Sequence, residues 1–111
     1  MQALHILIML RGKNIENTSG KKLLLDADWD KLFHLSNAIH GDFITRIKND
    51  FPTLTKHDIE ICCLLRFGIE HEVLGSIFLT ETDSVTKAKR RMKKRLNLSA
   101  SDDLDVFLLK Y

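Results

Sequence analysis

Apolar residues recur through most of this chain at steps of three and four, which is the spacing that lines one face of an α-helix. The alternation typical of strands is poor, and the 111 residues include only five glycines and one proline. With 44% hydrophobic and 29% charged residues, the chain has enough apolar surface for a core and is not compositionally disordered. The sequence therefore predicts an all-α protein, as one domain or one domain with a short appendage.

The expected helices are short and follow one another closely. Pro52 disfavours helical geometry at Phe51 and should end the helix before it. The polar stretch over residues 13–22 is typical of a loop or linker. We expect helices over residues 3–11, from near Trp29 through Ile39, from Phe43 towards Pro52, over 56–66, 70–78 and 83–96, and over a last segment opened by Ser101, Asp102 and Asp103 and carrying Leu104, Phe107 and Leu108.

Short polar residues and one glycine mark the ends of these helices. Thr55, followed by Asp58 three residues later, resembles a capping box with the shorter acid. The expected N-caps are Asp26 or Asp28, Asp42, Thr55 and Asp83, and the expected C-terminal cap is Gly68.

The formal net charge of +2 conceals an uneven distribution of charge. Residues 84–96 hold seven of the 17 basic side chains and none of the 15 acidic ones, so the remainder of the chain is net acidic. One concentrated positive segment on such a body can orient the whole molecule towards a polyanion. The seven are Lys87, Lys89, Arg90, Arg91, Lys93, Lys94 and Arg95.

A helical wheel of about 100° per residue sorts this basic segment into two faces. The apolar stripe consists of Val85, Ala88, Met92 and Leu96, and the opposite face carries Lys87, Arg90, Arg91 and Lys94. Such a helix can pack on a core while it directs four cations outward. Like charges at these spacings repel one another, so we expect a bound partner rather than a merely solvated face.

Double-stranded DNA suits a helix of this kind. The major groove is about 12 Å wide and admits one α-helix, from which Arg or Lys donates to guanine O6 and N7. Flanking cations neutralise phosphates and release counterions. Thr82, Ser84 and the first backbone N–H groups of the helix are expected to hold a phosphate, because a helix N-terminus favours anions.

A second short helix, over residues 70–78, is expected just before the basic one. Two helices joined by a tight turn, the second of them basic, are typical of a helix-turn-helix. Gly75 is expected where the two helices approach closely, because a small residue suits that contact.

Residues 51–68, FPTLTKHDIEICCLLRFG, and residues 84–98, SVTKAKRRMKKRLNL, resemble the LuxR/GerE-type helix-turn-helix at the C-terminus of bacterial transcriptional regulators. More narrowly, the chain is similar to the output domain of long bacterial sensor-regulators that carry repeats, a membrane segment and then this domain. Residues 28–30 and 43–47 also resemble the segment before that domain, so the resemblance covers roughly residues 28–109.

The resemblance implies a four-helix LuxR-type domain preceded by one or two extra helices, with a scaffold helix over 70–78 and a recognition helix over 83–96. It also implies a buried Val85 and DNA contacts from Thr86, Lys87, Lys89, Arg90 and Lys93. With the residues proposed above from their chemistry, the predicted DNA-binding set is Thr82, Ser84, Thr86, Lys87, Lys89, Arg90, Arg91, Lys93 and Lys94. The chain departs from the family pattern at Glu70, at Val73-Leu74-Gly75 and at Leu79.

These inferences combine into one prediction of organisation and function. Residues 1–27 are expected to form an N-terminal helical segment and linker, and residues 28–111 a helical extension plus the LuxR-type domain, whose core is about 52–111. The expected function is the DNA-binding output domain of a bacterial transcriptional regulator at the cytoplasmic nucleoid, controlled by an upstream sensor or regulatory region outside this chain. The chain is expected to be either a fragment of a longer protein or a stand-alone small regulator. The alternative is a protein-interaction module whose basic helix docks an acidic protein.

Two further expectations concern apolar surface. Residues 4–10 lack an obvious mate and are expected to be a truncated helix that packs on upstream sequence. The last helix leaves Val106, Leu109 and Tyr111 off its buried stripe, and the corresponding family helix makes a dimer contact, so we predict a homodimer on DNA. The aromatic residues Trp29, Phe33, Phe43 and Phe51 are expected to lie in the core, against the helix over 56–66.

No enzyme, cofactor, metal site or membrane segment is expected. The histidines are scattered without the spacing of metal ligands, and no phosphate loop, serine elbow or carboxylate pair occurs. The apolar run over 6–10 is far too short to span a bilayer and lacks the flanks of a secretory signal. Cys62 and Cys63 are adjacent within a helix and are expected to be buried reduced thiols. The histidines are His5, His34, His40, His57 and His71.

Overall fold

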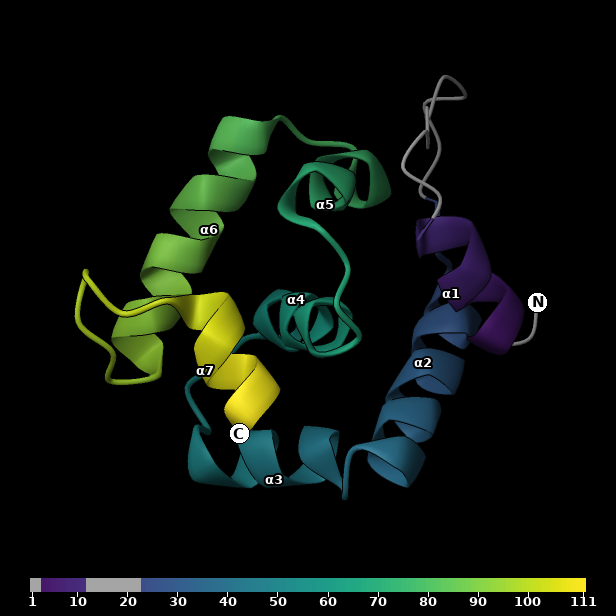
Figure 1. The fold of residues 1–111 in the computed structure, drawn as a ribbon, viewed down its shortest axis with the longest axis horizontal. Helices are drawn as coiled ribbons and strands as arrows, with labels where there is room; N and C mark the ends of the chain where they lie inside the picture. The colour runs from purple at the N-terminus through teal and green to yellow at the C-terminus, as the bar shows by residue number, and fades with distance from the viewer. Residues whose placement is uncertain (1–2, 12–22) are drawn as a thin grey trace.

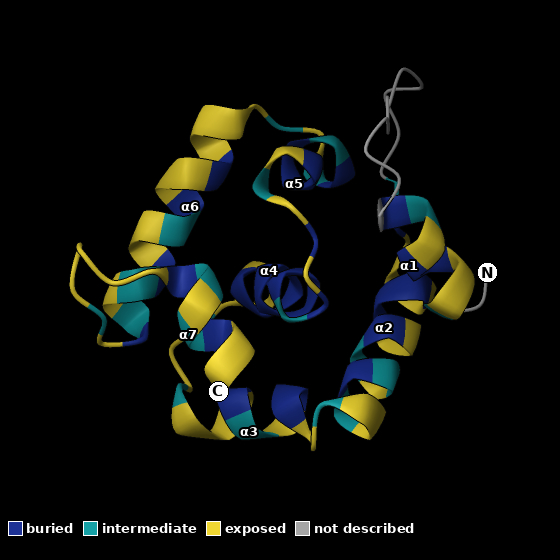
Figure 2. Cartoon of the chain, viewed as in Figure 1, coloured by how far each residue is buried: buried dark blue, intermediate teal, exposed yellow. Residues whose placement is uncertain are grey.

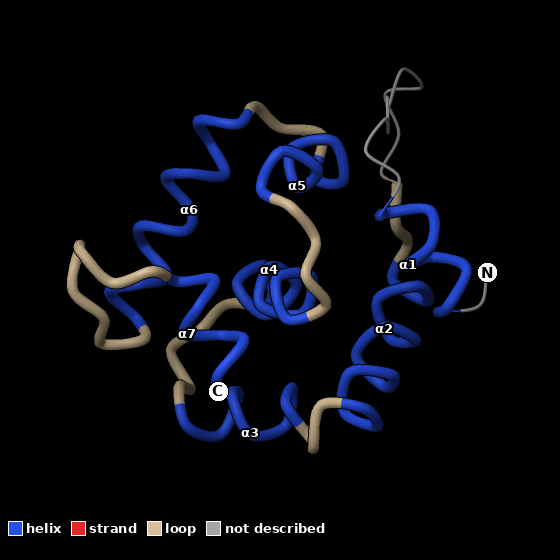
Figure 3. The backbone as a smooth tube through the Cα atoms, in the orientation of Figure 1, coloured by secondary structure: helices blue, strands red, loops and turns tan. Residues whose placement is uncertain are grey.

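The computed structural model describes residues 3–11 and 23–111, and in these ranges it consists of seven helices and no strand (Figure 1). The all-α prediction is therefore confirmed for the described residues, whereas the loop predicted over 13–22 lies outside them. Short connections join the helices from α2 onward (Figure 3). The helices are α1 (Ala3–Arg11), α2 (Asp26–Ile39), α3 (Phe43–Asp50), α4 (Lys56–Arg66), α5 (His71–Phe78), α6 (Thr82–Arg95) and α7 (Leu104–Lys110).

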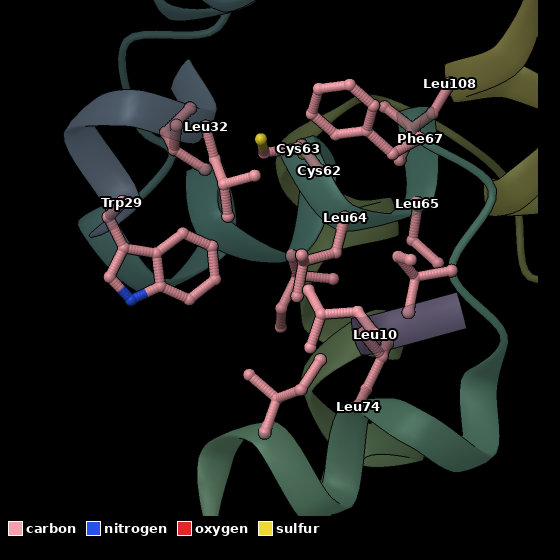
Figure 4. Close-up of a cluster of buried hydrophobic side chains, with 14 of the residues drawn as sticks. Leu10, Trp29, Leu32, Cys62, Cys63, Leu64, Leu65, Phe67, Leu74 and Leu108 are labelled. Carbon is pink, nitrogen blue, oxygen red and sulfur yellow. The ribbon is translucent and has the colours of Figure 1, made fainter. Parts of the chain in front are cut away.

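Helix α4 is the centre of the fold. In Figure 1 it is seen end-on with the other helices around it, and it packs against α2, α3 and α7. Every residue from Asp58 to Leu65 is buried, so the helix is enclosed on all sides rather than on the one face that its spacing predicts (Figure 2). Among them are Cys62, Cys63, Leu64 and Leu65, which Figure 4 labels, together with Ile59 and Ile61.

The two cysteines are free and buried, as expected. Burial raises the pKa of the Cys62 thiol to about 12, and the neighbouring Asp58 carboxylate acts in the same direction. Burial raises the pKa of the Cys63 thiol as well. Both thiols are therefore protonated at neutral pH and pack as small apolar side chains.

Helix α1 has a packing partner within this chain, contrary to the prediction that it packs on upstream sequence. It packs along α2, and Ile6 and Leu10 are fully buried in the same core as α4. Leu10 lies among core side chains that include Leu64 and Leu74 (Figure 4). In the portion of the chain that the structure describes, no helix has both the length and the apolar character needed to cross a membrane.

Helix α2 supports α5 through aromatic contacts. Trp29 is buried, and its ring stacks on that of Phe78, the last residue of α5, with centroids 5.7 Å apart. Phe43 is fully buried, and Phe33 and Phe51 pack partly buried against the core. The prediction is thus confirmed for Trp29 and Phe43, whereas Phe33 and Phe51 lie at the edge of the core, and the Trp29 contact fixes one end of α5.

Two helix ends are formed as their local sequence predicts. The Thr55 hydroxyl accepts from the Asp58 N–H at 3.1 Å, and the Asp58 carboxylate accepts from the Thr55 N–H at 2.9 Å, which completes the capping box. At the other end of α4, Gly68 has φ +80, and the N–H groups of Gly68 and Ile69 donate to Leu65 and Leu64. This is the Schellman arrangement that favours glycine.

The N-caps of α2 and α3 differ from the prediction: at α2 the cap residue is another one, and at α3 Asp42 is the N-cap residue as predicted but its side chain does not cap. Helix α2 begins at Asp26 with Leu25 as the N-cap, three residues before the expected start, because the carboxylate of Asp28 accepts from the Leu25 N–H at 3.0 Å. Asp42 precedes α3 but makes no side-chain cap bond. The Asn37 side-chain oxygen replaces it by accepting from the N–H groups of Ile44 and Thr45 at 2.9 and 3.2 Å.

Candidate functional site

The basic helix α6 is anchored by its apolar stripe. Val85, Ala88 and Met92 are buried, and so is Leu96, which caps the helix at its C-terminal end. The face opposite this stripe is exposed, as the wheel predicts: Lys87, Arg90, Arg91 and Lys94 all lie at the surface (Figure 2). The sequence thus places one side of α6 in the core and the other in solvent.

These four outward cations have no neutralising neighbour in the described ranges. None of Lys87, Arg90, Arg91 and Lys94 forms an ion pair or a side-chain hydrogen bond with a residue that the structure describes. The like-charge repulsion between their positions on the helix is therefore relieved only by solvent and counterions in the isolated chain.

The remaining cations of α6 are held by the rest of the fold. Lys89 pairs with Asp105 of α7 at 3.2 Å, and only 14% of its side chain is exposed. Arg95 pairs with the buried Asp58 of α4 at 2.7 Å. Lys93 donates to the backbone carbonyl of Ala100 at 3.3 Å. Of the predicted contact residues, Lys89 and Lys93 consequently lie on the flank of α6 that faces α7 and the loop before it.

That flank borders an open groove in which both signs of charge meet. Thr86, Arg90 and Lys94 line one side of it, and residues 100–105 line the other. Asp102 and Asp103 in that loop accept from the N–H groups of Ser99 and Val106 at 2.7 and 3.1 Å. Arg90 and Lys94 therefore border both the groove and the outward face, whereas Lys87 and Arg91 do not line the groove.

The first turn of α6 differs from the prediction by one residue. The helix runs from Thr82 to Arg95 with Glu81 as its N-cap, so the expected capping role of Asp83 is wrong. The Glu81 side chain makes no cap bond, while its backbone carbonyl accepts from the N–H groups of Ser84 and Val85. Thr82 and Ser84, predicted to hold a phosphate, lie exposed at this end.

Helices α5 and α6 approach as closely as Gly75 allows. A Cβ atom on Gly75 would lie 2.8 Å from the backbone oxygen of Thr80, which is closer than carbon and oxygen normally approach. The Thr80 N–H in turn donates to the Gly75 carbonyl at 2.9 Å. Glycine at this position therefore sets the tight connection, as the sequence predicts.

Leu79 adopts a left-handed backbone conformation, with φ 53, at the end of α5. This conformation costs an ordinary residue about 1 to 2 kcal/mol, and glycine avoids the cost. The leucine side chain is 42% exposed, so its packing offsets only part of the cost of the left-handed conformation.

We therefore expect Leu79→Gly to raise the free energy of unfolding by about 0.5 to 1 kcal/mol, after allowing for the greater entropy of glycine in the unfolded chain. Urea denaturation followed by circular dichroism measures the change. A less stable variant would show that the Leu79 side chain contributes more than its backbone conformation costs.

Helix α7 exposes two of the three residues predicted to be off its buried stripe. Val106 and Leu109 are 44% and 48% exposed. Tyr111 is different, because its ring packs between Phe43 and Phe51, its hydroxyl donates to Asp50, and its backbone oxygen accepts from Arg46 at 2.9 Å. The prediction for Tyr111 is thus wrong.

Nothing in the sequence signals the two ion pairs that fix α6. Asp58 and Arg95 are 37 positions apart, and Lys89 and Asp105 are 16 apart. Charge patterning along one helix reports only on neighbours three and four residues away, so contacts between helices escape it.

Comparison of the chain with protein-family models, with curated proteins and with solved structures found no match.

Proposed function

We propose that this chain binds double-stranded DNA sequence-specifically, with α6 in the major groove, as the output domain of a bacterial transcriptional regulator at the nucleoid. The observation that carries the proposal is the division of charge on α6. Lys89 and Arg95 are ion-paired with acids of neighbouring helices, whereas the four cations of the outward face have no ion pair within the described residues. A polyanion supplies the missing partner.

The dimensions of α6 suit the groove. Its 14 residues make a rod about 21 Å long, which presents its outward face over several base pairs. Lys87, Arg90 and Lys94 lie within about 60° of one another on the wheel and would donate to guanine, while Arg91 at the edge of that face would reach phosphates. Helix α5 packs against α6, and its Gly75 lies against the connecting turn at Thr80, which supports α5 as the proposed scaffold helix of a helix-turn-helix.

Two parts of the proposal extend beyond this interface. The signal that controls binding comes from a sensor or regulatory region outside the 111 residues. The exposed Val106 and Leu109, one turn apart on α7, offer an apolar surface for a homodimer on DNA.

A salt-dependent mobility-shift titration tests the proposal. We expect Lys87→Ala combined with Arg90→Ala to weaken binding to random-sequence duplex about tenfold at low salt, because each substitution removes a cation from the outward face. On random-sequence duplex, where no base contact is specific, both cations act on phosphates, so the slope of log affinity against log salt should fall by about two.

Lys48→Ala combined with Lys110→Ala is the matched control, since it removes the same charge from α3 and from the end of α7. This control should keep the wild-type salt slope. Absence of binding to any duplex at low salt would refute the proposal. A different outcome would favour the protein-docking function over DNA binding. In that case wild-type protein binds an acidic protein but no DNA, and the Lys87→Ala, Arg90→Ala variant loses binding to the acidic protein.

A further inference from the structure

The outward face of α6 carries one acid among its cations. On the wheel, Asp83 falls in line with Lys87, Arg90 and Lys94, at steps of four, three and four residues. All four side chains are exposed, and we call this line the outward ridge. The ridge therefore begins with a carboxylate and continues with three cations.

Asp83 has no structural role that its contacts reveal. It does not cap α6, because Glu81 is the N-cap. Its carboxylate makes no hydrogen bond or ion pair with any residue that the structure describes, although Lys87 follows it one turn later. The helix dipole favours an acid in the first turn, where Asp83 lies, but this preference does not require the acid to be aligned with the outward cations.

The other acids next to α6 behave differently. Asp58 and Asp105 pair with Arg95 and Lys89 on the flanks of the helix. Asp83 alone among these acids lies on the ridge that would face the bases. A carboxylate there is repelled by phosphates, so its presence needs a compensating donor within the groove.

Cytosine provides such a donor. In the major groove the cytosine N4 amino group donates to Asp or Glu, whereas guanine presents acceptors to Arg and Lys. We propose that Asp83 is a specificity-determining residue that accepts from the N4 amino group of a cytosine. This inference rests on the proposed function and names one base, a cytosine, that the protein would recognise.

The spacing along the ridge locates that cytosine. Asp83 and Lys87 are separated by about 6 Å along the helix axis, which is close to two base-pair steps of about 3.4 Å. The target should therefore contain a cytosine within about two steps of the guanine that Lys87 or Arg90 contacts.

Selection of binding sites from a randomised duplex library, followed by titration of the selected site with each base substituted, tests the inference. Wild-type protein should show one cytosine-dependent position, with about tenfold weaker binding when that cytosine is replaced. Asp83→Ala should lose the discrimination at that position only. Asp83→Asn should shift it towards adenine, because asparagine pairs with adenine N6 and N7; a misfolded variant gains no such preference.

Glu81→Gln is the matched control. It removes the neighbouring negative charge, so it should raise affinity for every duplex slightly and leave the base preferences of the wild type unchanged. If Asp83→Ala behaves in the same way as Glu81→Gln, Asp83 is only a charge near phosphates and the inference is overturned, while DNA binding stands. If wild-type protein binds no duplex, the proposed function fails and the inference fails with it.

Discussion

Replacing Arg95 by alanine should lower the free energy of unfolding by about 3 kcal/mol. Arg95 donates at 2.7 Å to the Asp58 carboxylate, whose side chain is only 4% exposed. Loss of the guanidinium leaves a buried charge with one remaining bond, from the Thr55 N–H. Because Arg95 itself is one-third exposed, we place the cost at the lower end of the range for broken buried pairs. Urea denaturation measures it.

The double variant Asp58→Asn, Arg95→Ala distinguishes the buried charge from lost packing, because it differs from Arg95→Ala only in the carboxylate. Once the carboxylate is neutral, no ion is stranded, so the double variant should recover more than half of the stability that Arg95→Ala loses. Equal losses in the two proteins would show that the arginine acts through its apolar stem instead.

Gly75→Ala should cost about 2 kcal/mol, although alanine is normally the better helix former. Alanine is favoured over glycine in a helix by about 1 kcal/mol. The new Cβ atom would however meet the Thr80 backbone oxygen at 2.8 Å, and no side-chain rotation can relieve a clash with backbone. Overpacking of this kind costs up to about 3 kcal/mol, so it outweighs the propensity. Thermal or urea unfolding of the two proteins measures the difference.

The same substitution should also weaken DNA binding, since relief of the clash moves the turn and thus α6. Glu72→Ala, on the exposed side of the same helix, should change stability by no more than about 0.5 kcal/mol. If the Gly75→Ala variant is as stable as wild type, the turn at Thr80 can move away from the new Cβ atom at no cost in free energy.

The features that sequence predicts correctly here are local ones. The bounds of α4, its capping box at Thr55 and its glycine at Gly68 all depend on residues within one turn of each other. The buried stripe of α6 likewise follows from spacing alone, because Val85 and Met92 must share a face whichever core they meet.

The features that escape the sequence depend on how helices meet. Helix α4 is buried on all sides because of its central position, which no pattern within it encodes. Tyr111 contacts α3, and α1 packs against α2, through contacts between segments that are separated in the sequence. In the candidate site, the sequence does not predict which cations form ion pairs with other helices. Nothing in the local sequence distinguishes Lys89 and Arg95, which are paired, from the other basic residues of α6.

The two ion pairs of α6 have a consequence for the thermodynamics of binding. They join the helix to α4 at one end and to α7 near its middle, so the backbone of α6, the proposed recognition helix, is held in place in the free protein. Such preorganisation leaves only the long outward side chains to be immobilised by a ligand, at roughly 0.5 to 1.5 kcal/mol for each of them. Association should therefore proceed close to rigid-body docking, with little folding coupled to it.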